Sequence, residues 1–391
     1  MAKFQRLINI TLIFYSCLTT SWTAKVIPSE SKVIHAEDDS ELLLVSTVFR
    51  HGDRTIDRSS RESYPNDPYN SHNFYPVGDG QLTNDGKQRS YELGLLLRNK
   101  YNSFLGDVYY PPYVYARCTE VIRTKMTLQL VLAALYPPID KQKWNEKLSW
   151  QPIDLIYTPI INDDLLFPIV CSTYREIYRD YLKNPKVKEK IEEFKDLMAI
   201  TSKHTGKSIT NLTDLALLYN TLYAESNMNL TLPNWTHDIF PKGALSNAVH
   251  LFLELLSYDQ LNNLNGGVLL NRVIDDMNKV INKSLPDRKI NLFSAHDINV
   301  AGLLHALNIS KYHIPEYTSS VIIELRKKDE EYFVKVLHYL GIPPTILQVQ
   351  IPGCEILCPY NKFVKLTESI TVFKQPCHPT KPKRETSLST I

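Results

Sequence analysis

Several features that mark large classes of protein are missing from this 391-residue chain. Its 44 lysine and arginine residues nearly balance its 42 aspartate and glutamate residues, so no net charge attracts nucleic acid or an anionic membrane. Beyond the N-terminal region, no apolar run approaches the roughly 18 residues that a membrane-spanning helix needs. The chain also has no internal repeat and no long low-complexity segment. We therefore expect a globular protein that binds neither nucleic acid nor membrane.

Two common sources of catalytic chemistry are also missing. No His-Glu-x-x-His pair occurs, and the other histidines lack the spacing of metal ligands, so we expect no metal site. The stretch from Gly80 to Lys87 only superficially resembles a P-loop. Five residues rather than four separate its glycines, and Gln88 stands where a P-loop has Ser or Thr. We predict no cofactor.

The beginning of the chain predicts export. Residues 1–24 contain Lys3 and Arg6, then an apolar stretch, then small and polar residues, which is the pattern of a secretory signal peptide. The tail at 381–391 is polar and has no features of a lipid-anchor signal. Secreted chains accept glycans at Asn-x-Ser/Thr. The candidate acceptors are Asn211, Asn229, Asn234, Asn282 and Asn308.

Cysteine usage agrees with an oxidising compartment. Once the signal segment is removed, the remaining cysteines are Cys118, Cys171, Cys354, Cys358 and Cys377. This number is odd, so at least one thiol is unpaired unless it bridges to another chain. We expect disulfides rather than a zinc cluster, because disulfides form readily in secreted proteins.

Strand and helix patterns alternate along the rest of the chain. Strands are predicted at 41–49, 114–116 and 289–295. One helix is predicted to begin at Thr83 and a second to extend over 119–135. The range 172–285 is predicted to be mainly helical. In the helix after Thr83, we expect Tyr91, Leu95 and Leu96 to form the apolar face. The pattern predicts an α/β fold with a mostly parallel sheet flanked by helices. Its core would comprise 38–140 and 286–380, with 141–285 as an inserted, mainly helical cap.

The first predicted strand runs directly into Arg50-His51-Gly52-Asp53-Arg54. In open α/β sheets, ligands bind beyond the carboxyl ends of the strands. Arginines on both sides of a histidine suit a phosphoryl group. The planar guanidinium of arginine forms bidentate hydrogen bonds with two phosphate oxygens and stays charged at any working pH. The sequence therefore predicts a phosphate-binding site here rather than a solvated basic turn.

Two other strand ends carry candidates for the same site. Arg117 follows the strand at 114–116, with Arg123 six residues further on, and His296-Asp297 follow the strand at 289–295. A second His-Asp pair, His237-Asp238, follows no predicted strand, and we interpret it as part of a surface loop.

The ordered set of motifs resembles the histidine acid phosphatases. The likeness is to the animal prostatic and lysosomal branch and its secreted insect relatives, and it extends from about residue 42 to Cys377. The motifs are Arg50-His51-Gly52-x-Arg54, Leu82-Thr83-x-x-Gly86, Arg117-x-Thr119 and Ser294-Ala295-His296-Asp297. The resemblance implies the histidine phosphatase fold, which phosphoglycerate mutases share.

The resemblance also implies a role for each site residue. His51 would be the nucleophile that forms a phosphohistidine, with its other ring nitrogen donating to a backbone carbonyl. Asp297 would protonate the leaving alkoxide and then activate water, so we expect an acidic pH optimum. The residues that would bind the phosphate oxygens are Arg50, Arg54, Arg117 and His296.

Further implications concern cysteines and partners. The family's disulfides map onto Cys171–Cys377 and Cys354–Cys358, which leaves Cys118 unpaired beside Arg117, where we expect it to make the enzyme sensitive to thiol reagents. The substrates would be small phosphate monoesters or phosphoproteins, and the chain would form a homodimer. No metal ion would be needed, because the cationic side chains replace it.

Other functions compete with this one. A phytase or other inositol-phosphate phosphatase has the same motifs, but the loop from Asp57 to Asp79 is more acidic than a phytate cleft should be. A mutase of this superfamily is disfavoured by the signal segment. A catalytically silent binding protein is disfavoured because His51 and Asp297 are both present, and the sequence leaves open a structural role with incidental activity.

Overall fold

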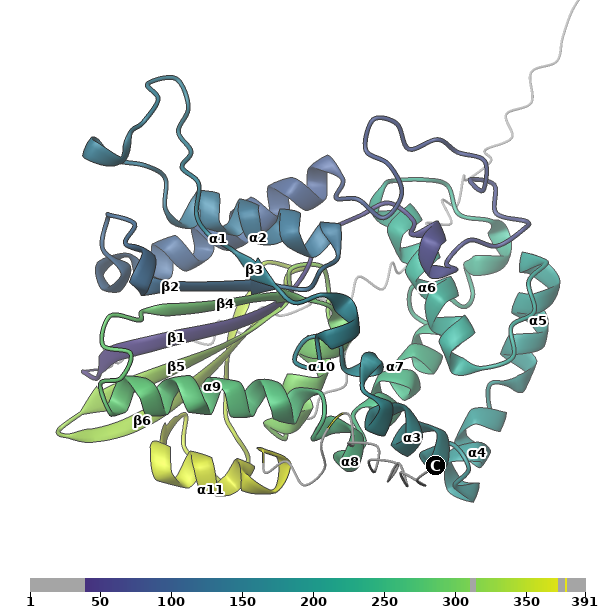
Figure 1. Ribbon diagram of the computed structural model, residues 1–391. Coiled ribbons are helices and arrows are strands. Elements are labelled where there is room, and N and C mark those ends of the chain that lie inside the picture. The colour runs from purple at the N-terminus through teal and green to yellow at the C-terminus, as the bar shows by residue number, and fades with distance from the viewer. Residues whose placement is uncertain (1–38, 310–313, 372–376, 378–391) are drawn as a thin grey trace, which may run out of the picture. The chain divides into compact units, whose positions relative to one another are not determined.

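Within the described residues, a single mixed sheet forms the centre of the fold (Figure 1). Its strands are β1 (Glu41–Arg50), β2 (Val114–Cys118), β3 (Ile156–Tyr157), β4 (Ile290–Ala295), β5 (Ser320–Lys328), β6 (Glu331–Tyr339), β7 (Ile346–Val349) and β8 (Leu357–Pro359). The strand order is β3-β2-β4-β1-β5-β6-β7, and β8 pairs with β6. Strands β3, β2, β4 and β1 are parallel to one another, whereas β5 to β8 pair in antiparallel fashion.

The computed structural model describes residues 39–309, 314–371 and Cys377. The predicted signal peptide at 1–24 and the polar tail at 381–391 lie outside these residues. Among the helices of the described ranges, none is long and apolar enough to cross a bilayer.

The helices are distributed between the sheet and a separate helical region. They are α1 (Asn84–Leu105), α2 (Ile122–Leu135), α3 (Ser172–Tyr181), α4 (Pro185–Glu192), α5 (Lys195–Thr205), α6 (Leu212–Asn227), α7 (Ala244–Leu256), α8 (Asp259–Asn262), α9 (Gly266–Ile281), α10 (Asp297–Ala306) and α11 (Tyr360–Thr371). Short 3-10 turns are η1 (Arg58–Ser60), η2 (Pro111–Tyr113), η3 (Asp140–Gln142), η4 (Ile160–Asn162), η5 (Pro168–Val170) and η6 (Asn234–Thr236).

Strand β1 is buried on both faces, and its alternate residues enter two different cores. Leu44 and Val48 pack with side chains of α9, α10 and α11. Val45 and Phe49 pack with side chains of α1 and α2. Successive strand residues point to opposite faces of a sheet, so one apolar run serves both layers. Figure 1 shows α1 and α2 along one face and α9 along the other. The predicted α/β class and flanking helices are confirmed.

The antiparallel half of the sheet begins with a hairpin whose turn lacks the usual sequence signal. Strands β5 and β6 pair along their whole length, and the turn between them is Asp329-Glu330. Both turn residues have positive φ, 46° and 66°. Such turns usually contain Asn-Gly or Asp-Gly, and Asp-Glu lacks that signal.

Helix α1 begins where predicted but turns a different face to the core. The Thr83 side chain accepts a hydrogen bond from the Gly86 amide at 3.1 Å, which confirms the predicted N-cap. The buried face instead comprises Leu93, Leu97, Tyr101 and Leu105. The predicted stripe was wrong because Tyr91 and Leu95 are each 37% exposed, and only Leu96 packs partly against the core.

Helices α4 to α7 pack around a core of their own, which includes Leu215, Leu222 and Leu245. Helix α9 differs from them, because Leu269, Leu270 and Val273 belong to the same core as the sheet. The predicted cap boundary at residue 285 therefore falls after a helix that packs on the sheet.

A pair of carboxyl groups joins the loop 57–79 to α6. Glu225 on α6 is completely buried and faces Asp67 in the loop, which is 7% exposed. Both carboxyl oxygens of Glu225 and Oδ2 of Asp67 have no donor partner among the described residues. Two facing carboxyl groups attract each other only when they share a proton. Burial and, after it, the charge of Asp67 together raise the pKa of Glu225 from 4.5 to about 9.

We predict that this pair makes the fold most stable in acid. The pKa of Glu225 lies above its ordinary 4.5, so its stabilisation is complete below pH 4.5 and is lost as the pH rises toward about 9. The loss is at most about 1.4 kcal/mol per pH unit. Thermal unfolding between pH 4 and 9 would show a flatter curve for Glu225→Gln, because the amide donates to Asp67 at every pH. Parallel curves for the variant and the wild type would contradict the shared proton.

Candidate active site

The parallel pairing of β1 and β4 brings the two predicted histidines together. Arg50 lies opposite Ala295 in the register of the two strands, so His51 and His296 leave the sheet at the same edge. Their ring centroids lie 5.6 Å apart. Strand β2 ends beside β4, and from its end the Thr119 hydroxyl reaches Nε2 of His296 at 3.1 Å.

Gly52 allows the turn after His51 to lie against the start of α1. A Cβ at Gly52 would collide with the Gly86 carbonyl and the Ser90 hydroxyl, and a Cβ at Gly86 would collide with the Asp53 backbone. The Gly52 amide donates to the Thr127 hydroxyl at 3.1 Å. The close packing of the two segments requires a glycine in each, at Gly52 of the Arg-His-Gly motif and at Gly86 of the Thr-x-x-Gly motif.

The His51 ring is held as a neutral acceptor at one nitrogen. Its Nδ1 lies 2.8 Å from the Gly52 carbonyl oxygen, which only accepts, so Nδ1 carries the proton. Nε2 then has a free lone pair, and Nε of Arg123 donates to it at 3.1 Å. Burial lowers the pKa of His51 well below 6.5, and the charges of Arg123 and Arg50 lower it further. A neutral imidazole nitrogen of this kind is a competent nucleophile.

Arg123 therefore lies against His51, whereas the sequence analysis assigned phosphate binding to Arg117. It is the second residue of α2, and its guanidinium also pairs with Asp57 at 3.0 Å. Burial would raise the pKa of Asp57, but hydrogen bonds from Ser59 and the charge of Arg123 outweigh it and lower this pKa to about 2. Asp57 therefore stays ionised and holds the Arg123 side chain in place.

Arg117 lies away from His51, so the structure does not support its predicted role in phosphate binding. Its guanidinium donates to Asp163 at 2.6 Å and to the Thr158 hydroxyl at 3.1 Å. Its neighbours Ala116 and Cys118 point into the α1–α2 core, so alternation directs Arg117 to the other face of the sheet. The same alternation, applied to a strand that extends to Cys118, argues against Arg117 but does not by itself select Arg123.

Substitution of the two arginines should separate their roles. We expect Arg123→Ala to lower kcat/KM by about 10²- to 10³-fold, because one buried cation is lost from the site. Its loss of stability should be smaller than that of Arg117→Ala, because Asp57 keeps hydrogen bonds from the Ser59 and Ser60 hydroxyls. Arg117→Ala should instead lower the free energy of unfolding by about 3–5 kcal/mol, because Asp163 loses its buried partner. Phosphatase assays and thermal unfolding of both variants test this. An Arg117→Ala protein of normal stability and greatly reduced activity would contradict it.

The other two arginines are fixed by partners on several segments. Arg54 forms two hydrogen bonds with Glu62, at 2.7 and 2.5 Å, and both side chains are buried. Arg50 donates to the Pro315 carbonyl at 2.7 Å and packs on the Tyr317 ring, 4.4 Å from its centroid. Nε of Arg50 and Nε of Arg54 are buried without an acceptor among the described residues. Unpaired buried donors of this kind are suited to an anion.

Asp297 lies at the first residue of α10, 3.3 Å from the Arg50 guanidinium. Its side chain is 27% exposed, so it faces both the arginine cluster and open space. Burial would raise the pKa of Asp297, but the charge of Arg50, together with His296 and the hydrogen bond from the Ile298 amide, keeps the pKa below its usual value. Burial and the charge of Arg123 lower the pKa of the neighbouring His296.

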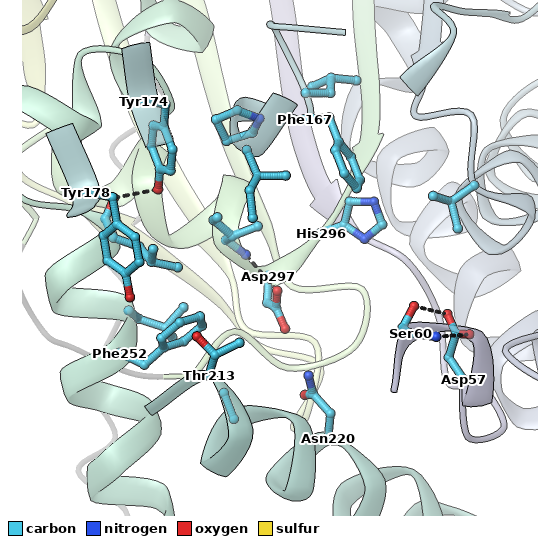
Figure 2. Close-up of a pocket in the computed structure, with 18 of the residues that line it drawn as sticks. Asp57, Ser60, Phe167, Tyr174, Tyr178, Thr213, Asn220, Phe252, His296 and Asp297 are labelled. Atoms are coloured by element: carbon cyan, nitrogen blue, oxygen red, sulfur yellow. Dashed lines mark hydrogen bonds between the residues drawn. The ribbon is translucent and has the colours of Figure 1, made fainter. Parts of the chain in front are cut away.

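A cavity of about 950 Å³ opens beside this cluster (Figure 2). His296, Asp297, Arg123 and Asp57 line one part of it. Most of its remaining wall is apolar or aromatic, and includes Leu166, Phe167, Tyr174, Tyr178, Phe252 and Leu253. In Figure 2, Tyr174, Tyr178 and Phe252 lie on one side of Asp297, and Asp57 and Ser60 lie on the other. This cavity is where the organic part of a ligand would lie.

The cysteines pair as the resemblance implies. Disulfides join Cys171 to Cys377 and Cys354 to Cys358, and Cys118 is the free cysteine of the described residues. The Cys118 side chain is completely buried, and burial raises the pKa of its thiol to about 11.

We therefore expect the enzyme to resist thiol reagents, contrary to the expectation from its position beside Arg117. Iodoacetamide reacts with exposed thiolates, and Cys118 is neither exposed nor ionised. Treatment of the folded enzyme at pH 8 should change phosphatase activity by less than about twofold. Rapid inactivation, protected by inorganic phosphate, would contradict this.

Comparison with known proteins gives one consistent result. Residues 41–339 match the family model described as histidine phosphatase superfamily, branch 2. The chain is 43% identical to venom acid phosphatase of Apis mellifera over 333 residues, which covers 85% of this chain and 86% of the relative. It is 35% identical to prostatic acid phosphatase of Homo sapiens, covering 83% and 84%. The solved phytase of Hafnia alvei with myo-inositol hexakis sulphate superposes with a TM-score of 0.63 at 16% identity, covering 88% and 99%.

Proposed function

The chain belongs to branch 2 of the histidine phosphatase superfamily, among the histidine acid phosphatases, and we propose that it is a secreted acid phosphatase that hydrolyses phosphate monoesters through a phosphohistidine on His51. One observation carries this proposal. The neutral Nε2 of a buried histidine lies within a cluster of three arginines, beside a carboxyl group that is open to a large cavity.

In the first half of the proposed reaction, Nε2 of His51 attacks phosphorus as the bond to the ester oxygen breaks. Arg123 must release Nε2 for this attack, and its guanidinium is then free to bind a phosphate oxygen. Arg50, Arg54 and His296 stabilise the other oxygens, and such charge stabilisation dominates phosphoryl transfer. Asp297 gives its proton to the departing alkoxide.

In the second half, water replaces the histidine. Asp297, now ionised, takes a proton from water as the oxygen attacks phosphorus, and the bond to Nε2 breaks. Asp297 must be protonated when the cycle starts, although Arg50 lowers its pKa in the free enzyme. A bound phosphate dianion offsets the charge of Arg50 and raises this pKa, which accounts for the expected acidic optimum.

Hydrolysis of p-nitrophenyl phosphate from pH 3 to 9, with a chelator present, tests the proposed function. We expect an optimum on the acid side and no effect of the chelator. Absence of activity in the wild type would favour the silent binding protein. Phytate as a second substrate tests the phytase alternative, which we do not favour because the cavity wall is mainly apolar.

The proposal includes secretion and glycosylation. The sequence of residues 1–24 and the two disulfides support an exported protein. All the predicted acceptor asparagines are exposed, as glycan attachment requires: Asn211, Asn229, Asn234, Asn282 and Asn308. Mass measurement of the secreted protein before and after glycan removal tests this part of the proposal.

We also propose a homodimer, formed at the free edge of the sheet. Strand β3 ends the strand order of the described residues, and its Ile156 and Tyr157 are 43% and 47% exposed. Trp144 and Trp150, in the preceding loop, are also exposed. Apolar residues on an open edge favour pairing with a second copy. Light scattering should give twice the mass of one chain, and Ile156→Lys should reduce it to one.

A further inference from the structure

The cavity beside Asp297 is much larger than the reaction requires. Its volume of about 950 Å³ is at the upper end of the range for whole drug-sized ligands, about 300–1,000 Å³. A phosphoryl group would lie in the arginine cluster, so most of this space is left for the alcohol portion of the ester. A small alcohol or a single aromatic ring would fill only a minor part of it.

The wall of this cavity is built from apolar side chains of several elements. Phe252 and Leu253 come from α7, Tyr178 from α3, and Phe167 and Ile169 from the segment before α3. Tyr174 and Tyr178 lie near Phe252 in the view of Figure 2. Apolar surface in contact with water is unfavourable, and an apolar ligand that covers it is bound more tightly.

Few charged groups line the wall outside the catalytic cluster. Asp57, Arg123 and Asp297 belong to the catalytic cluster, and Asp57 is itself an anion. Arg175 and Arg179 are the other charged residues among the described lining residues, which include no lysine. The Arg175 guanidinium already donates to two backbone carbonyls, those of Ile169 and Val170, at 3.0 Å each.

We propose that the preferred substrates are phosphate monoesters of long-chain apolar alcohols, represented by monoalkyl phosphates, with the chain lying along the cavity. The inference rests on the proposed phosphatase function and adds its substrate class. Hydrolysis uses one water and yields inorganic phosphate and the alcohol. Burial of the chain lowers the free energy of the bound state and of the transition state together, so its effect appears in kcat/KM.

A series of n-alkyl phosphates from methyl to octyl tests the proposal in the full-length enzyme. We expect kcat/KM to rise about threefold for each added methylene until the cavity is filled, because each buried methylene adds a nearly constant increment. Glycerol phosphate, with a short polar alcohol, should behave like the methyl ester. A flat series, or one that falls with chain length, would overturn the inference.

Two matched isoleucines provide the variants. Ile169 lines the cavity and is 56% exposed, whereas Ile200 on α5 is 52% exposed and lies outside the cavity. We expect Ile169→Asp to reduce kcat/KM for octyl phosphate at least fivefold, with less than a twofold change for methyl phosphate. Ile200→Asp should leave the whole series unchanged. Equal effects of the two variants on octyl phosphate would contradict a chain-binding cavity.

Hydrolysis of p-nitrophenyl phosphate distinguishes the two levels of the proposal. If the wild-type enzyme cleaves p-nitrophenyl phosphate but shows no dependence on chain length, the proposed phosphatase function stands and the proposed substrate class is contradicted. If the wild-type enzyme cleaves neither p-nitrophenyl phosphate nor any alkyl phosphate, both the phosphatase function and the substrate class are contradicted.

Discussion

Replacement of His51 by alanine should abolish phosphatase activity while the protein stays folded. We expect kcat for p-nitrophenyl phosphate to fall by at least about 10⁴-fold, because the variant lacks the neutral ring nitrogen that attacks phosphorus from within the arginine cluster. The ring that is removed is neutral, and Arg123 keeps its ion pair with Asp57, so stability should not suffer greatly.

The chain offers a matched control for this substitution. His237 lies at the end of η6, is exposed, and precedes an aspartate just as His296 does. We expect His237→Ala to keep full activity. Base-quenched enzyme should carry a phosphoryl group on the peptide that contains His51, and this group should be missing from His51→Ala. A phosphoryl group on another residue, or near-normal turnover by His51→Ala, would contradict the proposed mechanism.

Replacement of Asp297 by asparagine should affect esters according to their leaving groups. An alkoxide needs a proton as it departs, so we expect kcat/KM for alkyl phosphates to fall by about 10²- to 10⁴-fold, the usual contribution of a general acid. Nitrophenolate leaves without a proton, so kcat/KM for p-nitrophenyl phosphate should fall less than about tenfold. The second half-reaction would still lack its base, so a burst of nitrophenolate should precede slow turnover.

The pH dependence gives a second measure of Asp297. Activity toward an alkyl phosphate requires the protonated carboxyl group, so the wild-type kcat should fall as the pH rises above the pKa of Asp297 in the complex. The Asp297→Asn profile should be flatter on that side. Asp238→Asn, at the exposed His-Asp pair, serves as the control. An Asp297→Asn enzyme that loses the same factor on both ester types would show that Asp297 positions Arg50 rather than donating a proton.

Much of the candidate site was predictable because its chemistry is contiguous in the sequence. His51 is flanked by Arg50 and follows a buried strand, and Asp297 follows His296 at the end of another strand. Parallel strands bring their carboxyl ends to one edge of a sheet, so the two motifs had to meet. The α/β class and the Thr83 helix start follow from equally local patterns of hydrophobicity and capping.

The choice between Arg117 and Arg123 was of a different kind. Both lie within six residues of the same strand end, and both are arginines that a phosphate group would attract. The direction of each side chain depends on the alternation of β2 and on the start of α2, and then on Asp163 and Asp57, which are distant in sequence. Residue type and spacing alone do not distinguish a buried structural ion pair from a ligand-binding cation.

By itself, the sequence indicated the fold class, the disulfide pairing through the family resemblance, and the two residues that we propose as nucleophile and acid. The tertiary structure decided which arginine lies against His51, which face of α1 is buried, that Asp67 and Glu225 meet, and that the cavity is apolar. The physical reason is the distance along the chain over which each kind of interaction acts. Strand and helix periodicity and motif chemistry act over a few neighbouring residues, whereas a pocket wall or a buried carboxyl pair exists only after segments far apart in the chain have packed together.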